Sequence, residues 1–136
     1  CGQASVGRGL AAGDIDNDGD LDLLVTSVGG PAQLFRNIAP RQGHWLAIRA
    51  IDPALGGRDA YGAEIVIESS GQQRWKTVQP STSYLVSNDP RVHFGLGPIT
   101  SVAGIRMIWP DGTEERFAGG TVDRSITLSK GTGIKP

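Results

Sequence analysis

Short apolar runs separated by turn residues constrain the fold of this chain more than any other feature of its sequence. The 136 residues include 20 glycines and 8 prolines, so turns are frequent and long helices are not expected. Between the turns, apolar and polar residues alternate, as in a strand with one buried face. Short strands with turn signals about every 8–12 residues are typical of a sandwich or a small barrel. The pattern therefore predicts an all-β chain.

Two unlike parts follow each other along the chain. Residues 5–37 combine an Asp- and Gly-rich loop with short apolar runs, and they predict three strands. From Trp45 onward the alternation recurs, with Leu46, Ile48 and Ala50 on one face of a strand and Ala63, Ile65 and Ile67 on one face of the next. Further strands are expected at 73–79, 91–96, 105–109, 113–117 and 125–128. Pro110-Asp111-Gly112 predicts a turn, because proline presets φ and Asp-Gly tolerates positive φ.

Charge and hydropathy exclude several classes of partner. The chain has 13 Lys and Arg against 14 Asp and Glu, and its net charge of −1 gives no electrostatic reason to expect nucleic acid or an anionic membrane. No apolar run approaches the roughly 18 residues of a membrane-spanning helix. Cys1 has the position of a lipidated cysteine in a mature bacterial lipoprotein, but we expect a domain cut from a longer protein.

The strongest chemical signal is the run of aspartates between Asp14 and Asp22. Asp14, Asp16, Asp18 and Asp22 occupy positions 1, 3, 5 and 9 of a tight loop, where their carboxylates can converge on one point. Gly19 permits a sharp reversal that turns the carbonyl of Asp20 inward as well. Carboxylates this close repel each other unless a cation neutralises them. Because all five ligands are hard oxygens, we expect Ca²⁺ rather than Mg²⁺ or Zn²⁺.

The loop has two alternative interpretations. An EF-hand needs a bidentate Glu at position 12 and two flanking helices, whereas position 12 here is Val25 within an apolar β-type run. The EF-hand is therefore rejected. The remaining alternative is a solvated Asp-rich turn without an ion.

Catalytic residues are not predicted. His44 and His93 can be grouped with Ser81, Ser83, Ser87 and Asp89 as a hydrolase-like set, but no spacing places a base beside a nucleophile. Four aromatic residues suggest a carbohydrate-binding sandwich if they lie on an exposed sheet face, with core packing as the simpler explanation. They are Tyr61, Trp75, Tyr84 and Trp109.

Family resemblance adds to these inferences. The first part resembles one FG-GAP/VCBS repeat, the calcium-loop blade of integrin-type β-propellers, through Gly9-Leu10 to Asp22, Leu23-Leu24-Val25 and Gln33-Leu34-Phe35-Arg36-Asn37. The remainder resembles the ASPIC/UnbV domain, which follows such repeats at the C-terminus. The matching stretches are His44-Trp45-Leu46, Arg58-Asp59-Ala60-Tyr61-Gly62-Ala63, Ser83-Tyr84-Leu85, His93-Phe94-Gly95-Leu96-Gly97 and Trp109-Pro110-Asp111-Gly112.

The resemblance implies a domain plan: a repeat at 1–39, a connector at 40–44, an antiparallel β-sandwich or barrel-like domain at 45–130 and a tail at 131–136. A propeller needs about four to eight blades, so upstream repeats of the same polypeptide are expected partners. The implied function is a calcium-binding, non-enzymatic interaction or adhesion module with an unidentified protein or glycan partner. The implied location is extracellular, on the cell surface or periplasmic. The alternative is an enzyme or accessory protein of natural-product biosynthesis.

Overall fold

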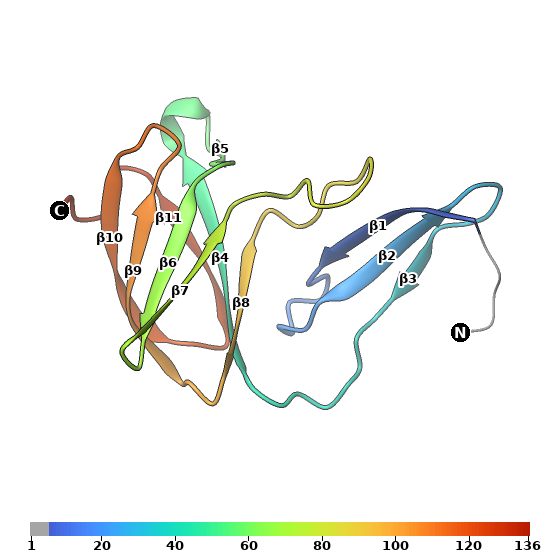
Figure 1. Ribbon diagram of the computed structural model, residues 1–136, viewed down its shortest axis with the longest axis horizontal. Coiled ribbons are helices and arrows are strands. Elements are labelled where there is room, and N and C mark those ends of the chain that lie inside the picture. Colours follow the sequence, from blue (N-terminus) through green and yellow to red (C-terminus); the bar gives the residue numbers. More distant parts are fainter. Residues whose placement is uncertain (1–5) are drawn as a thin grey trace. The chain divides into compact units, whose positions relative to one another are not determined.

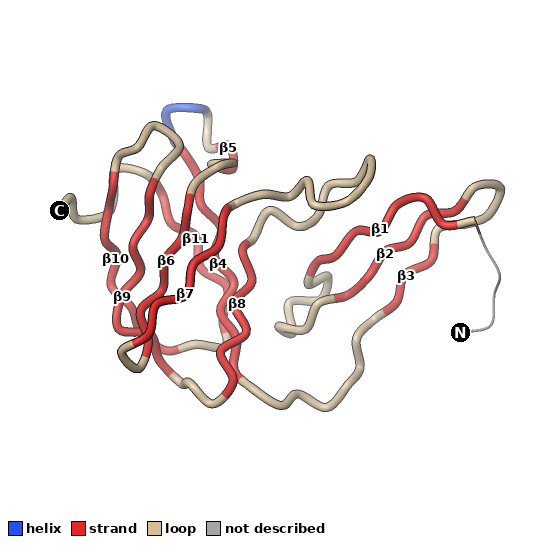
Figure 2. Tube along the Cα trace, viewed as in Figure 1, coloured by secondary structure: helices blue, strands red, loops and turns tan. Residues whose placement is uncertain are grey.

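The computed structural model describes residues 6–136, and Cys1 lies outside the described residues. Strands dominate this part of the chain, and its one helical element is the single 3-10 turn η1, Pro53–Leu55 (Figure 2). The all-β prediction is confirmed. Within residues 6–136 no helix combines the length and apolar character needed to cross a lipid bilayer.

The chain divides into two compact units, residues 1–41 with 80–89 and residues 42–79 with 90–136. The first unit contains an antiparallel sheet in the order β1-β2-β3, coloured blue to cyan in Figure 1. Its strands are β1 (Gly7–Gly13), β2 (Asp22–Ser27) and β3 (Gln33–Phe35). The Asp-rich loop joins β1 to β2, as the sequence predicts.

The second unit holds two four-stranded sheets. One has the order β10-β9-β6-β7; in the other, β4 pairs with β11 along one edge and with β5 and β8 along the opposite edge. The strands are β4 (His44–Asp52), β5 (Arg58–Asp59), β6 (Glu64–Ser69), β7 (Gln72–Thr77), β8 (Val92–Gly97), β9 (Ser101–Ile108), β10 (Glu114–Thr121) and β11 (Arg124–Ser129).

One apolar core lies between these two sheets. The predicted inward faces are confirmed: Ile48 of β4, Ile65 and Ile67 of β6, and Met107 of β9 are fully buried in one cluster. The turn at 110–112 is also confirmed, since Gly112 has φ +81° and donates its N–H to the Trp109 carbonyl at 2.8 Å. The second unit is therefore a two-sheet sandwich, and the strand pairs of the described residues close no barrel.

The sandwich departs from the predicted antiparallel arrangement at one pair, because β11 runs parallel to β4. The chain passes directly from β10 in one sheet to β11 in the other, and Asp123 fixes this crossing. Asp123 has φ +57°, its N–H donates to the Trp45 carbonyl at 2.7 Å, and its carboxylate accepts from the Trp45 N–H at 3.1 Å. These bonds anchor the start of β11 beside the start of β4, so the two strands run in the same direction.

Candidate metal centre

The Asp-rich loop is organised around the buried carboxylate of Asp14. Asp14 is 4% exposed and accepts backbone hydrogen bonds from Asp18 at 3.1 Å and from Gly19 at 3.0 Å. The chain reverses at Gly19, whose φ of +93° confirms the sharp turn predicted at this glycine. A carboxylate that bonds two amides of its own loop holds the loop in a closed conformation without any metal.

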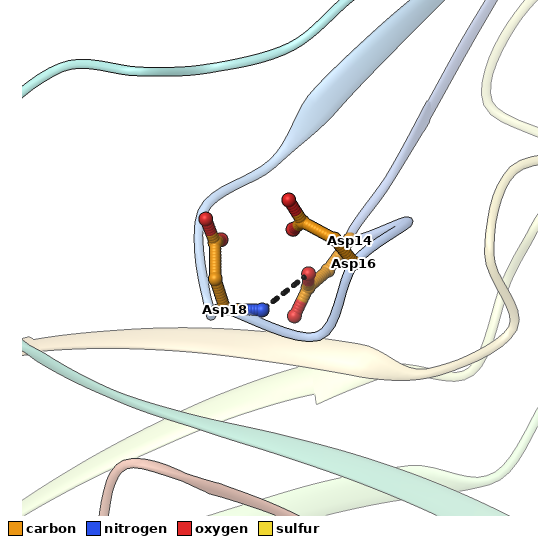
Figure 3. Close-up of side chains that lie close together, drawn as sticks. All are labelled: Asp14, Asp16 and Asp18. Carbon is orange, nitrogen blue, oxygen red and sulfur yellow. Dashed lines mark hydrogen bonds between the residues drawn. The ribbon is translucent and has the colours of Figure 1, made fainter.

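Three of the predicted ligands come together in this loop. Asp14, Asp16 and Asp18 each offer a carboxylate oxygen, and these oxygens all lie within 4.8 Å of one another. Figure 3 shows the three side chains gathered at the loop, with the Asp18 amide donating to Asp14. Ca²⁺ binds oxygen at about 2.3–2.6 Å, so one ion can reach two oxygens with this separation. The donor set therefore fits a calcium ion.

Asp20 and Asp22 do not belong to this group of three carboxylates. The Asp20 N–H donates to the Asp18 carboxylate at 2.9 Å. Asp22, which is 3% exposed, accepts from the Ile15 N–H at 3.1 Å and from the Asn37 N–H at 2.8 Å. The Asn37 bond and then the Ile15 bond hold the pKa of the Asp22 carboxyl below its ordinary value. Asp22 thus ties the loop to the chain beyond β3, and its role as a ligand stays a prediction.

Arg36 supplies a positive charge at the rim of the loop. Its guanidinium forms an ion pair with the Asp16 carboxylate, and the two side chains are 56% and 29% exposed. The ion pair uses Oδ2 of Asp16, and an ionised carboxylate has a second oxygen that can accept a further contact. Arg36 can therefore remain beside an ion at this site or give way to it.

Sequence reasoning missed the contribution of residues 80–89 to this region. Asn88 accepts a hydrogen bond from the Ala12 N–H at 2.8 Å, and the Asp89 N–H donates to the Ala12 carbonyl at 3.1 Å. Asp89 lines a hollow of about 200 Å³ together with Asp14 and Asp22. No motif signals this contact, since Ala12 and Asn88 are 76 positions apart in sequence.

The candidate catalytic residues are divided between the two units. Ser81, Ser83, Ser87 and Asp89 belong to the first unit, whereas His44 and His93 belong to the second. His44 Nδ1 lies 2.6 Å from the Asp123 carboxylate, and both side chains are more than a third exposed. His93 stacks on Trp45, with ring centroids 5.9 Å apart. A hydrogen bond from histidine to a carboxylate is thus present, at the surface of the sandwich.

The four aromatic residues also separate into two kinds. Trp109 is 1% exposed and belongs to the core, which is the simpler of the two predicted roles. Tyr61, Trp75 and Tyr84 are 54%, 66% and 71% exposed. Exposed aromatic rings remain available for stacking on a ligand.

Comparisons with known proteins agree with the predicted resemblance of the second part. The family model described as ASPIC and UnbV matches residues 55–135. Cartilage acidic protein 1 of Xenopus tropicalis, of Homo sapiens and of Mus musculus is in each case 32% identical to this chain over 111 residues. These matches cover 78% of this chain but only 16–17% of each relative, so the chain spans about a sixth of their length.

Proposed function

The chain belongs to the ASPIC and UnbV family, and from this premise we propose that it is a calcium-binding, non-enzymatic interaction module of an extracellular protein. The observation that carries the proposal is the group of three carboxylate oxygens within 4.8 Å of one another. Asp14, Asp16 and Asp18 would hold the ion, with Asp22 and the Asp20 carbonyl as the further predicted ligands. The ion would neutralise like charges that otherwise repel across the loop.

The extracellular location is supported by the match to proteins named for cartilage. It also suits the chemistry of the loop, since calcium sites of extracellular modules bind with dissociation constants of about 10⁻⁴–10⁻³ M. A loop that is already closed by hydrogen bonds to Asp14 needs little further ordering when an ion binds. The role proposed for calcium is therefore structural, and stability rises with its free concentration.

We also propose that the sheet β1-β2-β3 is an FG-GAP/VCBS blade whose neighbours are upstream repeats. Large apolar side chains are exposed on both of its faces. The strand register puts Leu10, Leu23 and Phe35 on one face and Leu24 and Leu34 on the other, with exposures between 38% and 50%. A sheet that is apolar on both faces is normally covered on both, as a propeller blade is by its neighbours.

Thermal unfolding of the chain in calcium, in magnesium and in chelator tests the proposed function. We expect the melting temperature to rise with calcium and to rise much less with magnesium, which demands near-ideal octahedral geometry. Asp18→Asn removes one carboxylate of the group, so the calcium Kd should rise about tenfold or more. The melting temperature of this variant in chelator should differ little from that of the parent.

Asp20→Asn is the matched control for this experiment. It removes the same charge from the same loop, but the Asp20 side chain is not one of the three gathered carboxylates. Its calcium Kd should stay within a few-fold of the parent value. Equal losses of affinity in both variants would mean that the loop attracts cations only through its net charge. The absence of any calcium effect on the parent would overturn the proposed function.

Carbohydrate binding is the second candidate function, and an exposed tryptophan favours it. Trp75 of β7 lies on the outer face of its sheet, opposite Val66 and in the same row as Arg106 and Arg116. On that face Arg106, Arg116, Glu68 and Gly104 line a hollow of about 160 Å³. An aromatic ring beside hydrogen-bonding side chains is suited to a sugar ring and its hydroxyl groups.

A glycan array probed in calcium tests this second candidate. Binding that is lost in Trp75→Ala and retained in Tyr61→Ala would assign it to the outer face of the sheet. An array signal no higher than background for the parent chain would remove carbohydrate binding from consideration.

The predicted enzyme or accessory role has a separate test at the exposed His44–Asp123 pair. If the chain has an activity that uses this pair, His44→Ala would abolish it.

A further inference from the structure

Residues 80–89 lie along the edge of β1 that does not pair with β2, close to the Asp-rich loop. The segment lies between β7 and β8 in sequence, yet it belongs to the same compact unit as the sheet β1-β2-β3. Ala12 is bonded on both its polar groups: its N–H donates to Asn88 Oδ1 at 2.8 Å, and its carbonyl accepts from the Asp89 N–H at 3.1 Å. Ala12 is two residues before Asp14, so these bonds hold the backbone that leads into the loop.

Two glycines of β1 allow this close approach. A Cβ on Gly9 would lie 2.5 Å from Cγ2 of Val86, and a Cβ on Gly13 would lie 3.0 Å from Cβ of Asp89. The distance at Gly9 is too short for any Cβ, whereas at Gly13 Asp89 would have to shift by a few tenths of an ångström. The segment therefore meets β1 at both ends of the strand, with Val86 over Gly9 and Asp89 over Gly13.

The segment also brings a carboxylate toward the loop. Asp89 lines the hollow of about 200 Å³ that Asp14 and Asp22 also line. Asp14 and Asp22 are both buried, at 4% and 3% exposure. Asp14 belongs both to this hollow and to the group of three carboxylates, so a cation held by that group relieves the repulsion between Asp14 and Asp89. The position of Asp89 thus makes docking of the segment more favourable when the loop holds a cation.

We propose that Asn88 and Asp89 are positioning residues that couple docking of residues 80–89 to calcium binding in the Asp-rich loop. This inference rests on the proposed calcium site and adds its regulation. Asn88 fixes β1 at Ala12, and Asp89 supplies the charge that makes docking depend on the ion. Because coupling between two equilibria is reciprocal, calcium protects the docked segment, and the docked segment raises calcium affinity.

The test combines calcium titration by calorimetry with amide hydrogen exchange. In the parent chain, saturating calcium should slow exchange of the Ala12 and Asp89 amides at least tenfold relative to chelator. Asn88→Ala removes the acceptor for the Ala12 N–H and should raise the calcium Kd about tenfold, as is typical when a group supporting a metal ligand is lost. Asn88→Asp keeps an acceptor oxygen for the Ala12 N–H and adds a negative charge, so its calcium Kd should be no higher than that of the parent.

Two further variants separate coupling from general loss of stability. Ser87→Ala changes an exposed side chain of the same segment and should leave both the Kd and the exchange rates unchanged. Asp89→Asn removes the repulsion between residue 89 and the carboxylates of the loop, so amide exchange of the segment in chelator should be slower than in the parent. Calcium should then slow this exchange by a smaller factor than it does in the parent. A general loss of stability would instead speed exchange in both buffers.

The outcomes distinguish this inference from the proposed function. A parent chain that binds no calcium refutes the calcium site, and the coupling with it. A parent chain that binds calcium with no change in exchange at residues 80–89, or an Asn88→Ala variant with the parent Kd, leaves the calcium site in place and refutes the coupling.

Discussion

Lys130 illustrates how single residues stabilise the sandwich at its surface. Its ammonium lies 2.5 Å from the Asp111 carboxylate and 3.5 Å from that of Asp52. The Lys130 bond, followed by the bonds from Thr113, holds the pKa of Asp111 well below its ordinary value. The Asp111 bond raises the pKa of Lys130 above its ordinary value. One lysine thus joins the turn at 110–112 to the end of β4.

The pH dependence of stability should report this contact. A carboxyl with a lowered folded-state pKa contributes stability above its unfolded value of 3.8, and this contribution is lost as the pH falls further. Asp111→Asn should therefore lower the melting temperature by about 1–4 °C at pH 7, with a smaller difference in high salt. The gap between variant and parent should narrow below pH 3.8. A gap that stays constant from pH 7 to pH 2 would contradict the ion-pair explanation.

At the scale of elements, β1 is shaped by its neighbours on both edges. It pairs with β2 along one edge, and residues 80–89 lie along the other. An exposed strand edge invites pairing with other chains, and the segment covers this one with a tight turn closed by the Ser83–Val86 bridge. Gly9 is buried at this contact, and a side chain at this position would not fit between β1 and Val86.

A methyl group at Gly9 should push the segment away from β1. We expect Gly9→Ala to lower the free energy of unfolding by about 1–3 kcal/mol, the usual cost of overpacking, in urea denaturation. Val86→Ala in the same chain should recover part of this loss, because it removes the closest atom, although Thr26 Oγ1 also lies 2.8 Å from the added Cβ. Gly7→Ala is the control, since a Cβ there meets nothing within 4 Å. Equal losses at both glycines would contradict the steric explanation.

At the scale of the whole molecule, the chain consists of two units with different sources of stability. The sandwich has a core of aliphatic and aromatic side chains between its two sheets. The unit of the Asp-rich loop exposes much of its apolar surface and carries the buried carboxylates of Asp14 and Asp22. We therefore expect the stability of the unit that contains the Asp-rich loop to depend on an ion or on neighbouring repeats. The stability of the sandwich should depend on neither.

Calorimetry should separate the two units. The chain should show two unfolding transitions, and calcium should raise only the one that belongs to the unit of the Asp-rich loop. At a free calcium concentration of one hundred times Kd, that unit should gain about 2.7 kcal/mol. The core amides of the sandwich, such as that of Ile65, should exchange at the same rate in calcium and in chelator. A single transition that shifts as a whole would show that the units unfold together.

Features that depend on neighbours along the chain could be predicted from the sequence alone. Alternation along a strand predicted the buried faces of β4, β6 and β9, and the Pro-Asp-Gly turn predicted the junction of β9 with β10. The spacing of aspartates around Gly19 predicted where carboxylates would gather. Each of these follows from the period of a strand or from the φ that a turn residue allows.

The tertiary structure was needed to show which residues meet across long sequence separations. It placed Asn88 and Asp89 beside Ala12, His44 beside Asp123, and β11 parallel to β4. It also gathered Asp14, Asp16 and Asp18 while bonding Asp22 to the amides of Ile15 and Asn37. Such contacts arise when whole elements pack and each buried polar group finds a partner. Local patterns in the sequence do not indicate which distant group that partner is.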